Sequence, residues 1–158
     1  MTRVVVVADS GSVMSDLTAA IGSVPGAYIV RHGSGRAKLD RLVAHVQPDL
    51  VVIGDLGQPQ EALARLGEVR RAAPAAKVVI LSSTPEASWL ADALRAEASA
   101  VLPGSIAPHT LAIVLREVIA APRADVASER RSRSAARRRS RTARRRSSVD
   151  LTQEGTAA

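Results

Sequence analysis

The stretch Val4-Val5-Val6-Val7-Ala8-Asp9-Ser10 indicates the fold, because four successive β-branched residues lead through one alanine into an acid and a hydroxyl. A continuous apolar run of this kind is typical of a strand that is buried on both faces of a parallel sheet. Further short apolar runs follow at residues 28–30, 50–53, 78–81 and 100–102. The sequence therefore predicts five strands.

Segments with helical spacing of apolar residues alternate with these strands. Residues 39–46 carry apolar side chains at positions i, i+3, i+4 and i+7, and Pro48 closes the segment. Comparable patterns begin at Val13, Leu63, Trp89 and Leu111. This alternation predicts a doubly wound α/β domain, in which helices cover both faces of a five-stranded parallel sheet.

The formal net charge of +7 is confined to the end of the chain. Residues 1–122 hold eleven basic and eleven acidic residues, whereas residues 123–158 hold eleven arginines and four acids. Large apolar residues are scarce in this second part, so that it cannot bury enough surface to offset the entropy of ordering. We therefore expect a folded domain over residues 1–121 and a disordered tail, rich in Arg, Ser and Ala, over residues 122–158.

The tail has ten arginines and no acid between residues 130 and 146, a pattern that favours binding to a polyanion. Arginine forks onto phosphates, and each neutralised phosphate releases a counterion. Aromatic residues are missing from this run, and so base stacking is not indicated and binding is expected to be nonspecific. The predicted nucleic-acid-binding residues are Arg130, Arg131, Arg133, Arg137, Arg138, Arg139, Arg141, Arg144, Arg145 and Arg146. An acidic protein ranks second as partner and an anionic membrane third, and a solvated tail without a partner is the remaining alternative.

Composition excludes several kinds of site. The chain has no cysteine, which excludes disulfides, thiolate metal sites and a cysteine nucleophile. Its three histidines are scattered, so they indicate no metal-ligand pair. The glycines around Ser34 lack the rest of a dinucleotide fingerprint and are interpreted as a flexible loop. No signal peptide is evident at the N-terminus, and we expect a cytoplasmic location, with nucleoid association if the tail binds DNA.

Four segments, at residues 4–10, 48–59, 77–83 and 100–111, resemble the receiver domain of bacterial two-component response regulators. The resemblance covers residues 1–121 and implies a flavodoxin-like fold. In that family an aspartate at the end of the third strand accepts a phosphoryl group. Acids of the first strand help to hold Mg²⁺, and a hydroxyl and a lysine contact the phosphoryl group. A hard divalent cation such as Mg²⁺ requires oxygen ligands. Phosphoryl transfer requires groups that neutralise the negative charge developing on the phosphoryl oxygens.

The resemblance implies that Asp55 is the phosphoacceptor, since the family's D-x-x-x-P spacing joins it to Pro59. The family's usual spacing from the Pro48-Asp49 pair would instead place the acceptor at Gly54. Asp9 and Asp55 are the implied metal ligands.

The hydroxyl that contacts the phosphoryl group is implied to be that of Ser82, with Ser83 as the alternative. From the residues alone, Asp9 is also a candidate cap for the following helix, and residues 82–84 are candidate turn residues.

Three departures from the family pattern point to an atypical receiver. Ser10 replaces the second acid of the first strand, Gly104 stands where the lysine belongs, and Val101 lies near the missing aromatic residue. We expect either no cofactor or weakly bound Mg²⁺. Phosphorylation of Asp55 is retained as the alternative.

The last helical segment has Ile113 outside its main apolar stripe. Receivers commonly dimerise through this region, and the resemblance implies an interface containing Trp89 and Ile113. The alternatives are that Trp89 belongs to the core and that the linker covers Ile113.

These observations predict a signalling or regulatory protein that is not an enzyme. An atypical receiver domain would serve dimerisation or partner docking, and a basic tail in place of an output domain would bind nucleic acid. The first alternative is a phosphorelay receiver, whose partner is a histidine kinase and whose Asp55 phosphorylation controls the tail. The second is an adaptor whose tail docks on an anionic membrane or an acidic protein.

Overall fold

The computed structural model describes residues 1–83, 86–122 and 136–139. The chain divides into two units, Met1–Ala121 and Pro122–Ala158. In the second unit the described residues, 136–139, are helical and include the exposed Arg137, Arg138 and Arg139. The other seven arginines predicted to bind nucleic acid lie outside the described residues, and the predicted boundary and disorder of the tail stay predictions.

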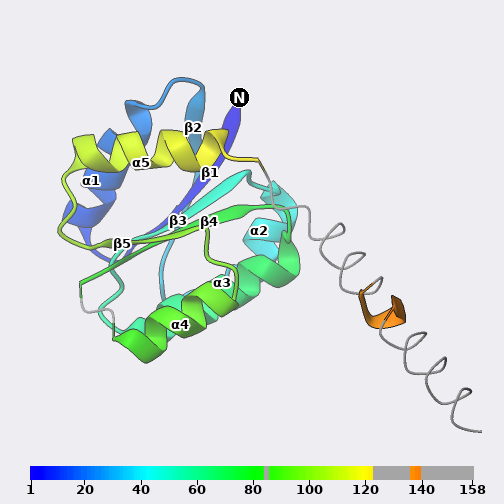
Figure 1. Ribbon diagram of the computed structural model, residues 1–158. Coiled ribbons are helices and arrows are strands. Elements are labelled where there is room, and N and C mark those ends of the chain that lie inside the picture. The colour runs from blue at the N-terminus through cyan, green and yellow to red at the C-terminus, as the bar shows by residue number, and fades with distance from the viewer. Residues whose placement is uncertain (84–85, 123–135, 140–158) are drawn as a thin grey trace, which may run out of the picture. The chain divides into compact units, whose positions relative to one another are not determined.

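The first unit is a five-stranded parallel sheet in the order β2-β1-β3-β4-β5 (Figure 1). This confirms the predicted doubly wound, flavodoxin-like α/β fold. The strands are β1 (Thr2–Val7), β2 (Ala27–Gly33), β3 (Leu50–Ile53), β4 (Lys77–Ser82) and β5 (Ala100–Pro103). The helices are α1 (Gly11–Gly22), α2 (Asp40–Val46), α3 (Pro59–Ala72), α4 (Ala87–Arg95) and α5 (Pro108–Ala120). Among the described residues, no helix combines the length and the apolar character that a membrane span requires.

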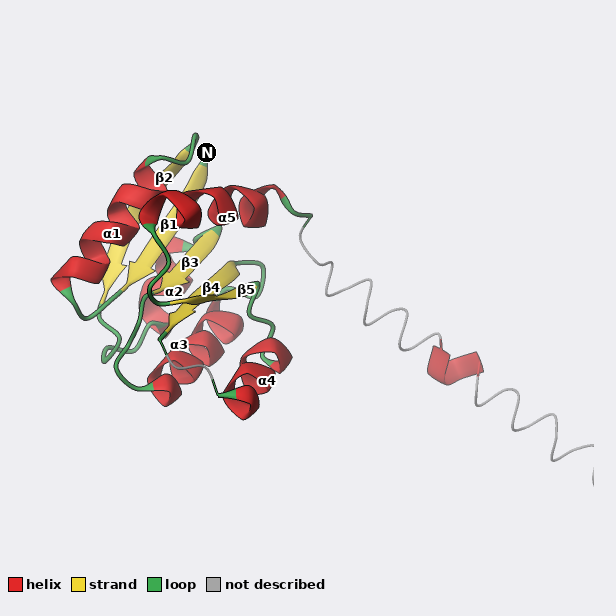
Figure 2. Cartoon of the chain, turned by 60° about the vertical axis from the view of Figure 1, so that its left-hand side comes forward, coloured by secondary structure: helices red, strands yellow, loops and turns green. Residues whose placement is uncertain are grey.

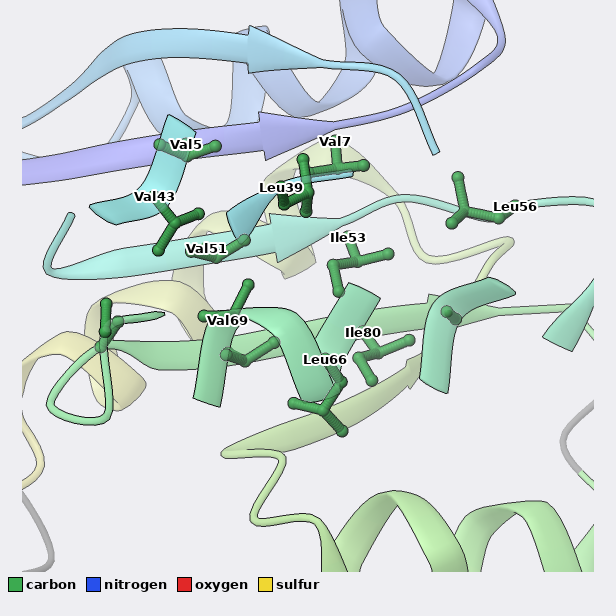
Figure 3. Close-up of a cluster of buried hydrophobic side chains, with 14 of the residues drawn as sticks. Val5, Val7, Leu39, Val43, Val51, Ile53, Leu56, Leu66, Val69 and Ile80 are labelled. Carbon is green, nitrogen blue, oxygen red and sulfur yellow. The ribbon is translucent and has the colours of Figure 1, made fainter. Parts of the chain in front are cut away.

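The sheet carries a separate hydrophobic core on each face. Helices α1 and α5 cover one face, and α2, α3 and α4 cover the other (Figure 2). Because alternate residues of a strand point to opposite faces, Val4 and Val6 join the first core, whereas Val5 and Val7 join the second. In the second core, Leu66 of α3 faces Ile80 and its neighbours on the strands (Figure 3). Aliphatic side chains therefore do the packing that aromatic residues do in many domains.

Strand β2 is longer than the predicted run of residues 28–30. It forms an edge of the sheet and pairs only with β1, across a register shift between Val4 and Val5. The C-terminal half of β2 carries the exposed Arg31 and His32, which interrupt the apolar pattern. The sequence pattern missed this half because an edge strand does not need to be apolar throughout.

Trp89 belongs to the core and not to an exposed interface, which corrects one of the two predicted interface residues. Its side chain is 4% exposed, and its indole Nε1 donates a hydrogen bond to the carbonyl oxygen of Pro59 at 2.8 Å. This bond joins α4 to the first residue of α3. Ile113 is 49% exposed, and its place in an interface stays a prediction.

Lys77 joins the beginning of β4 to the end of α5. Its ammonium group donates to the carbonyl oxygens of Val118 at 2.6 Å and Ile119 at 3.0 Å, and also to that of Ala121. The last carbonyl groups of a helix have no partner within the helix and carry partial negative charge. Lys77 therefore caps the helix from which the second unit continues.

We expect Lys77→Met to lower the free energy of unfolding by about 1–2 kcal/mol, because these carbonyl groups lose a cationic donor. Urea unfolding followed by circular dichroism measures the loss. Lys38→Met removes the other lysine of the chain, which is exposed, and serves as the control. Equal stabilities of the two variants would contradict the capping role.

Candidate functional site

Polar residues gather at the edge of the sheet where the parallel strands end. Asp9 follows β1, Asp55 follows β3, Ser82 closes β4 and Gly104 follows β5. The strands are paired near these ends, with Val7 opposite Ile53 and Ser82 opposite Pro103. In open α/β sheets this edge is where ligands bind.

The side chain of Asp55 faces the ends of β4 and β5. The Ser83 hydroxyl donates to Asp55 Oδ2, and the Ser83 backbone N–H lies 3.4 Å from Oδ1. A Cβ atom added to Gly104 would lie 2.8 Å from both Asp55 Oδ2 and Ser83 Oγ. Position 104 thus points at the Asp55 carboxylate, and a glycine there leaves that carboxylate without a side-chain cation from β5.

Gly54 faces away from this group. A Cβ atom added to it would lie 2.8 Å from Val13 Cγ1 and 3.3 Å from Ala8 Cβ, on the side of α1. Of the two acceptor positions that the sequence left open, position 55 is therefore the one that lies beside β4 and β5.

The hydroxyl beside Asp55 is that of Ser83 and not that of Ser82. Ser82 is 7% exposed, and its backbone carbonyl accepts a hydrogen bond of 3.0 Å from Gly104 N–H. Ser83 is exposed. Contact between Ser82 and a phosphoryl group stays a prediction, but the geometry favours the alternative, Ser83, as the hydroxyl of the site.

Asp9 binds the loop that follows β2. Its Oδ1 accepts hydrogen bonds from Ser34 Oγ at 3.0 Å and from the Gly35 backbone N–H at 2.8 Å. Gly35 is buried, and an added Cβ atom would lie 2.8 Å from Asp9 Oδ2 and would also collide with Leu56. Only glycine fits this approach without movement of its neighbours. The alternative of Asp9 as a helix cap is wrong, since the N-cap of α1 is Ser10 and has no side-chain cap bond.

The far end of the same loop is fixed by α3. The Glu68 carboxylate, 8% exposed as a residue, accepts from Leu39 N–H at 2.7 Å and from the Arg65 guanidinium at 3.2 Å. That guanidinium also donates to the Ala37 carbonyl oxygen. Residues 34–39, called here the β2–α2 loop, are therefore held at both ends. Sequence interpretation as a flexible loop missed these bonds, because the three side chains that make them lie far away in the chain.

The residues at this edge offer few ligands for a Mg²⁺ ion. Octahedral Mg²⁺ requires several free oxygen ligands, whereas Asp9 Oδ1 already accepts two bonds from the β2–α2 loop and Asp55 is held by Ser83. The Ser10 hydroxyl, which stands in place of an acid, lies 2.9 Å from the Ser12 hydroxyl. Within residues 1–83, 86–122 and 136–139, no three His, Asp or Glu side chains are grouped so that they would hold a metal ion.

Comparison with known proteins identifies the fold. No protein-family model and no curated protein matches the chain. Among solved structures, the response regulator domain of Thermotoga maritima CheB is 26% identical, with a TM-score of 0.62 over 75% of this chain and 93% of that one. A LuxR-family two-component response regulator from Aurantimonas sp. SI85-9A1 is 24% identical, with a TM-score of 0.64 over 85% and 99%. A LuxR-family DNA-binding response regulator from Staphylococcus aureus is 15% identical, with a TM-score of 0.62 over 75% and 99%. The folded unit therefore has the fold of response-regulator receiver domains.

We expect Asp9→Ala to lower the free energy of unfolding by about 1–2 kcal/mol, because Gly35 N–H and the Ser34 hydroxyl lose their acceptor. Asp9→Asn retains an acceptor oxygen and should cost less. Urea unfolding measures both variants, and Asp16→Ala, at an exposed position of α1, is the control. Faster exchange of the Gly35 amide hydrogen in Asp9→Ala alone would locate the effect. An Asp9→Ala variant as stable as Asp16→Ala would contradict the role of Asp9.

Proposed function

We propose that this is a signalling or regulatory protein without catalytic activity of its own, in which a receiver-fold domain docks partners and a basic tail binds nucleic acid. The observation that carries the proposal is the distribution of charge. Residues 1–122 are formally neutral, and the arginines of the remaining 36 residues supply the whole net charge of +7. A polycation joined to a neutral folded domain fits a polyanionic partner.

The geometry around Asp55 supports a domain that does not use the usual phosphoryl chemistry. A phosphoryl group there would meet Gly104, which offers no cation, and Ser83, whose hydroxyl already binds the carboxylate. Asp9 is committed to the β2–α2 loop. Charge that develops during phosphoryl transfer therefore lacks the neutralising groups that this reaction requires.

The receiver fold itself supports a role in signalling, because similar solved structures come from response regulators, and one of them is described as DNA-binding. A homodimer that uses Ile113, a histidine kinase or other signalling protein as partner, and a cytoplasmic location close to the nucleoid belong to the same proposal.

Phosphorylation of Asp55 is the alternative that changes the class of function. We expect acetyl phosphate with Mg²⁺ to add no phosphoryl group to the full chain, because Asp55 lacks a nearby lysine and a second free acid. Intact-mass spectrometry after incubation measures the addition, and a conventional receiver domain treated in parallel proves the reagent. A mass gain of one phosphoryl group that Asp55→Ala abolishes would establish the phosphorelay instead.

We expect the full chain to bind duplex DNA with an affinity that falls steeply with salt, and the tail arginines to carry this dependence. Each lost phosphate contact reduces the slope of log K against log salt by about 0.9, so that replacing six arginines by alanine should reduce it by up to about 5. Fluorescence anisotropy between low and moderate salt measures the slope. The replaced residues are Arg137, Arg138, Arg139, Arg144, Arg145 and Arg146.

Lysine at the same six positions is the matched control, because it keeps the charge and should keep most of the affinity. Absence of DNA binding at low salt would contradict the nucleic-acid proposal. Binding to vesicles with an anionic lipid, or to an acidic protein, in place of DNA would then favour the adaptor.

A further inference from the structure

We propose that the folded domain has a phosphate-binding surface of its own, formed by Arg31, Arg36, Lys38 and Arg41. These residues lie at the end of β2, in the β2–α2 loop and in the first turn of α2, and are called here the β2–α2 basic surface. Its ligand is the phosphate backbone of the nucleic acid that the tail binds. The inference rests on the proposed function and extends it from the tail to the domain.

The neutral total of the domain conceals a local excess of positive charge. Residues 31–41 contain four of the eleven basic residues of residues 1–122 and only one acid, Asp40. All four basic residues are exposed, and so is the neighbouring His32. A short segment of a neutral domain thus carries a charge of the sign that phosphates attract.

These four cations are not neutralised within the described part of the chain. Arg65 pairs with Glu68 and Arg95 pairs with Asp92, and none of the four basic residues of the surface takes part in these ion pairs. Asp40 accepts a hydrogen bond of 2.9 Å from the backbone N–H of Arg41. Asp9 accepts from Ser34 and Gly35 of the same loop. Neither Asp40 nor Asp9 forms an ion pair with any of the four basic residues, and residues 31–41 keep an excess of three positive charges.

The loop that presents Arg36 and Lys38 is ordered in advance. Asp9 binds its beginning, and Arg65 and Glu68 bind its end at Ala37 and Leu39. Inside the loop, Ala37 N–H donates to the Ser34 carbonyl oxygen at 3.2 Å. Cations on a fixed backbone lose less conformational entropy on binding than cations on an unfolded segment. Gly35, Ala37 and Leu39, whose backbone groups form these bonds, are the direct neighbours of Arg36 and Lys38. The bonds therefore fix the backbone positions of both basic residues.

The chemistry of the surface favours a phosphate backbone over a membrane. Membrane-binding surfaces combine basic residues with exposed apolar side chains that enter the lipid. Among residues 31–41 the one large apolar residue is Leu39, and it is 1% exposed. Exposed Arg and Lys side chains, with no Phe, Tyr or Trp among residues 31–41, position a protein on phosphates.

A second contact on the same chain raises the total affinity without making either contact stronger. Once the tail has bound, the domain samples the same nucleic acid at a high effective concentration. Because the surface and the tail each release counterions, their contributions to the salt dependence should add.

The test compares two variants of the full chain that lose the same charge. Arg36→Ala/Lys38→Ala removes two residues of the β2–α2 basic surface. Arg71→Ala/Arg116→Ala removes two exposed arginines from α3 and α5. Fluorescence anisotropy with duplex DNA measures the dissociation constant and its salt slope, and thermal melting confirms that both variants are folded.

We expect the first variant to bind DNA about 3–10-fold more weakly and to reduce the salt slope by about 2, and the control to change affinity less than about twofold. Equal affinities of the two variants would overturn the inference and leave the proposed function standing. A weaker first variant together with full affinity after loss of the tail arginines would support the surface and overturn the role of the tail. Failure of the unmodified chain to bind DNA at low salt would overturn both, and an effect confined to anionic vesicles would also overturn this inference.

Discussion

The hydrogen bonds between the Asp9 carboxylate and the β2–α2 loop determine the chemistry of this edge of the sheet. They occupy an acid that would otherwise be free to bind a cation, and they fix the backbone of Ser34 and Gly35. The Asp9 carboxylate therefore has two donors from its own chain, although the residue is exposed. These bonds hold the beginning of the β2–α2 loop, which carries Arg36 and Lys38.

The carboxylate of Asp55, like that of Asp9, accepts hydrogen bonds from neutral groups of the same chain. Ser83 donates to the carboxylate, and the absence of a side chain at Gly104 allows the backbone of the β5–α5 connection to approach it closely. Both acids at the edge are therefore satisfied by neutral donors of their own chain.

The fold could be predicted from the sequence, because buried strands such as residues 4–7 and 50–53 must be apolar on both faces. The position of Asp55 at the edge followed from the same pattern. What the pattern did not predict were contacts between distant residues, such as those of Asp9 with Gly35 and of Glu68 with Leu39. Trp89 shows the limit most clearly, since its helical spacing was compatible with both core and interface. Its bond to Pro59, which places it in the core, has no local signal.

The net charge of the folded domain and the charge of a short segment within it lead to different expectations about polyanions. Summed over residues 1–122 the charges cancel, and the folded domain looks indifferent to polyanions. The structure separates them: Arg65 and Arg95 are paired with acids of their own helices, whereas the basic residues between positions 31 and 41 have no acidic partner among the described residues. Phosphates within a Debye length respond to this local field and not to the total. A domain that is neutral in total is therefore compatible with a preferred orientation on a polyanion, because its basic residues are gathered in one segment.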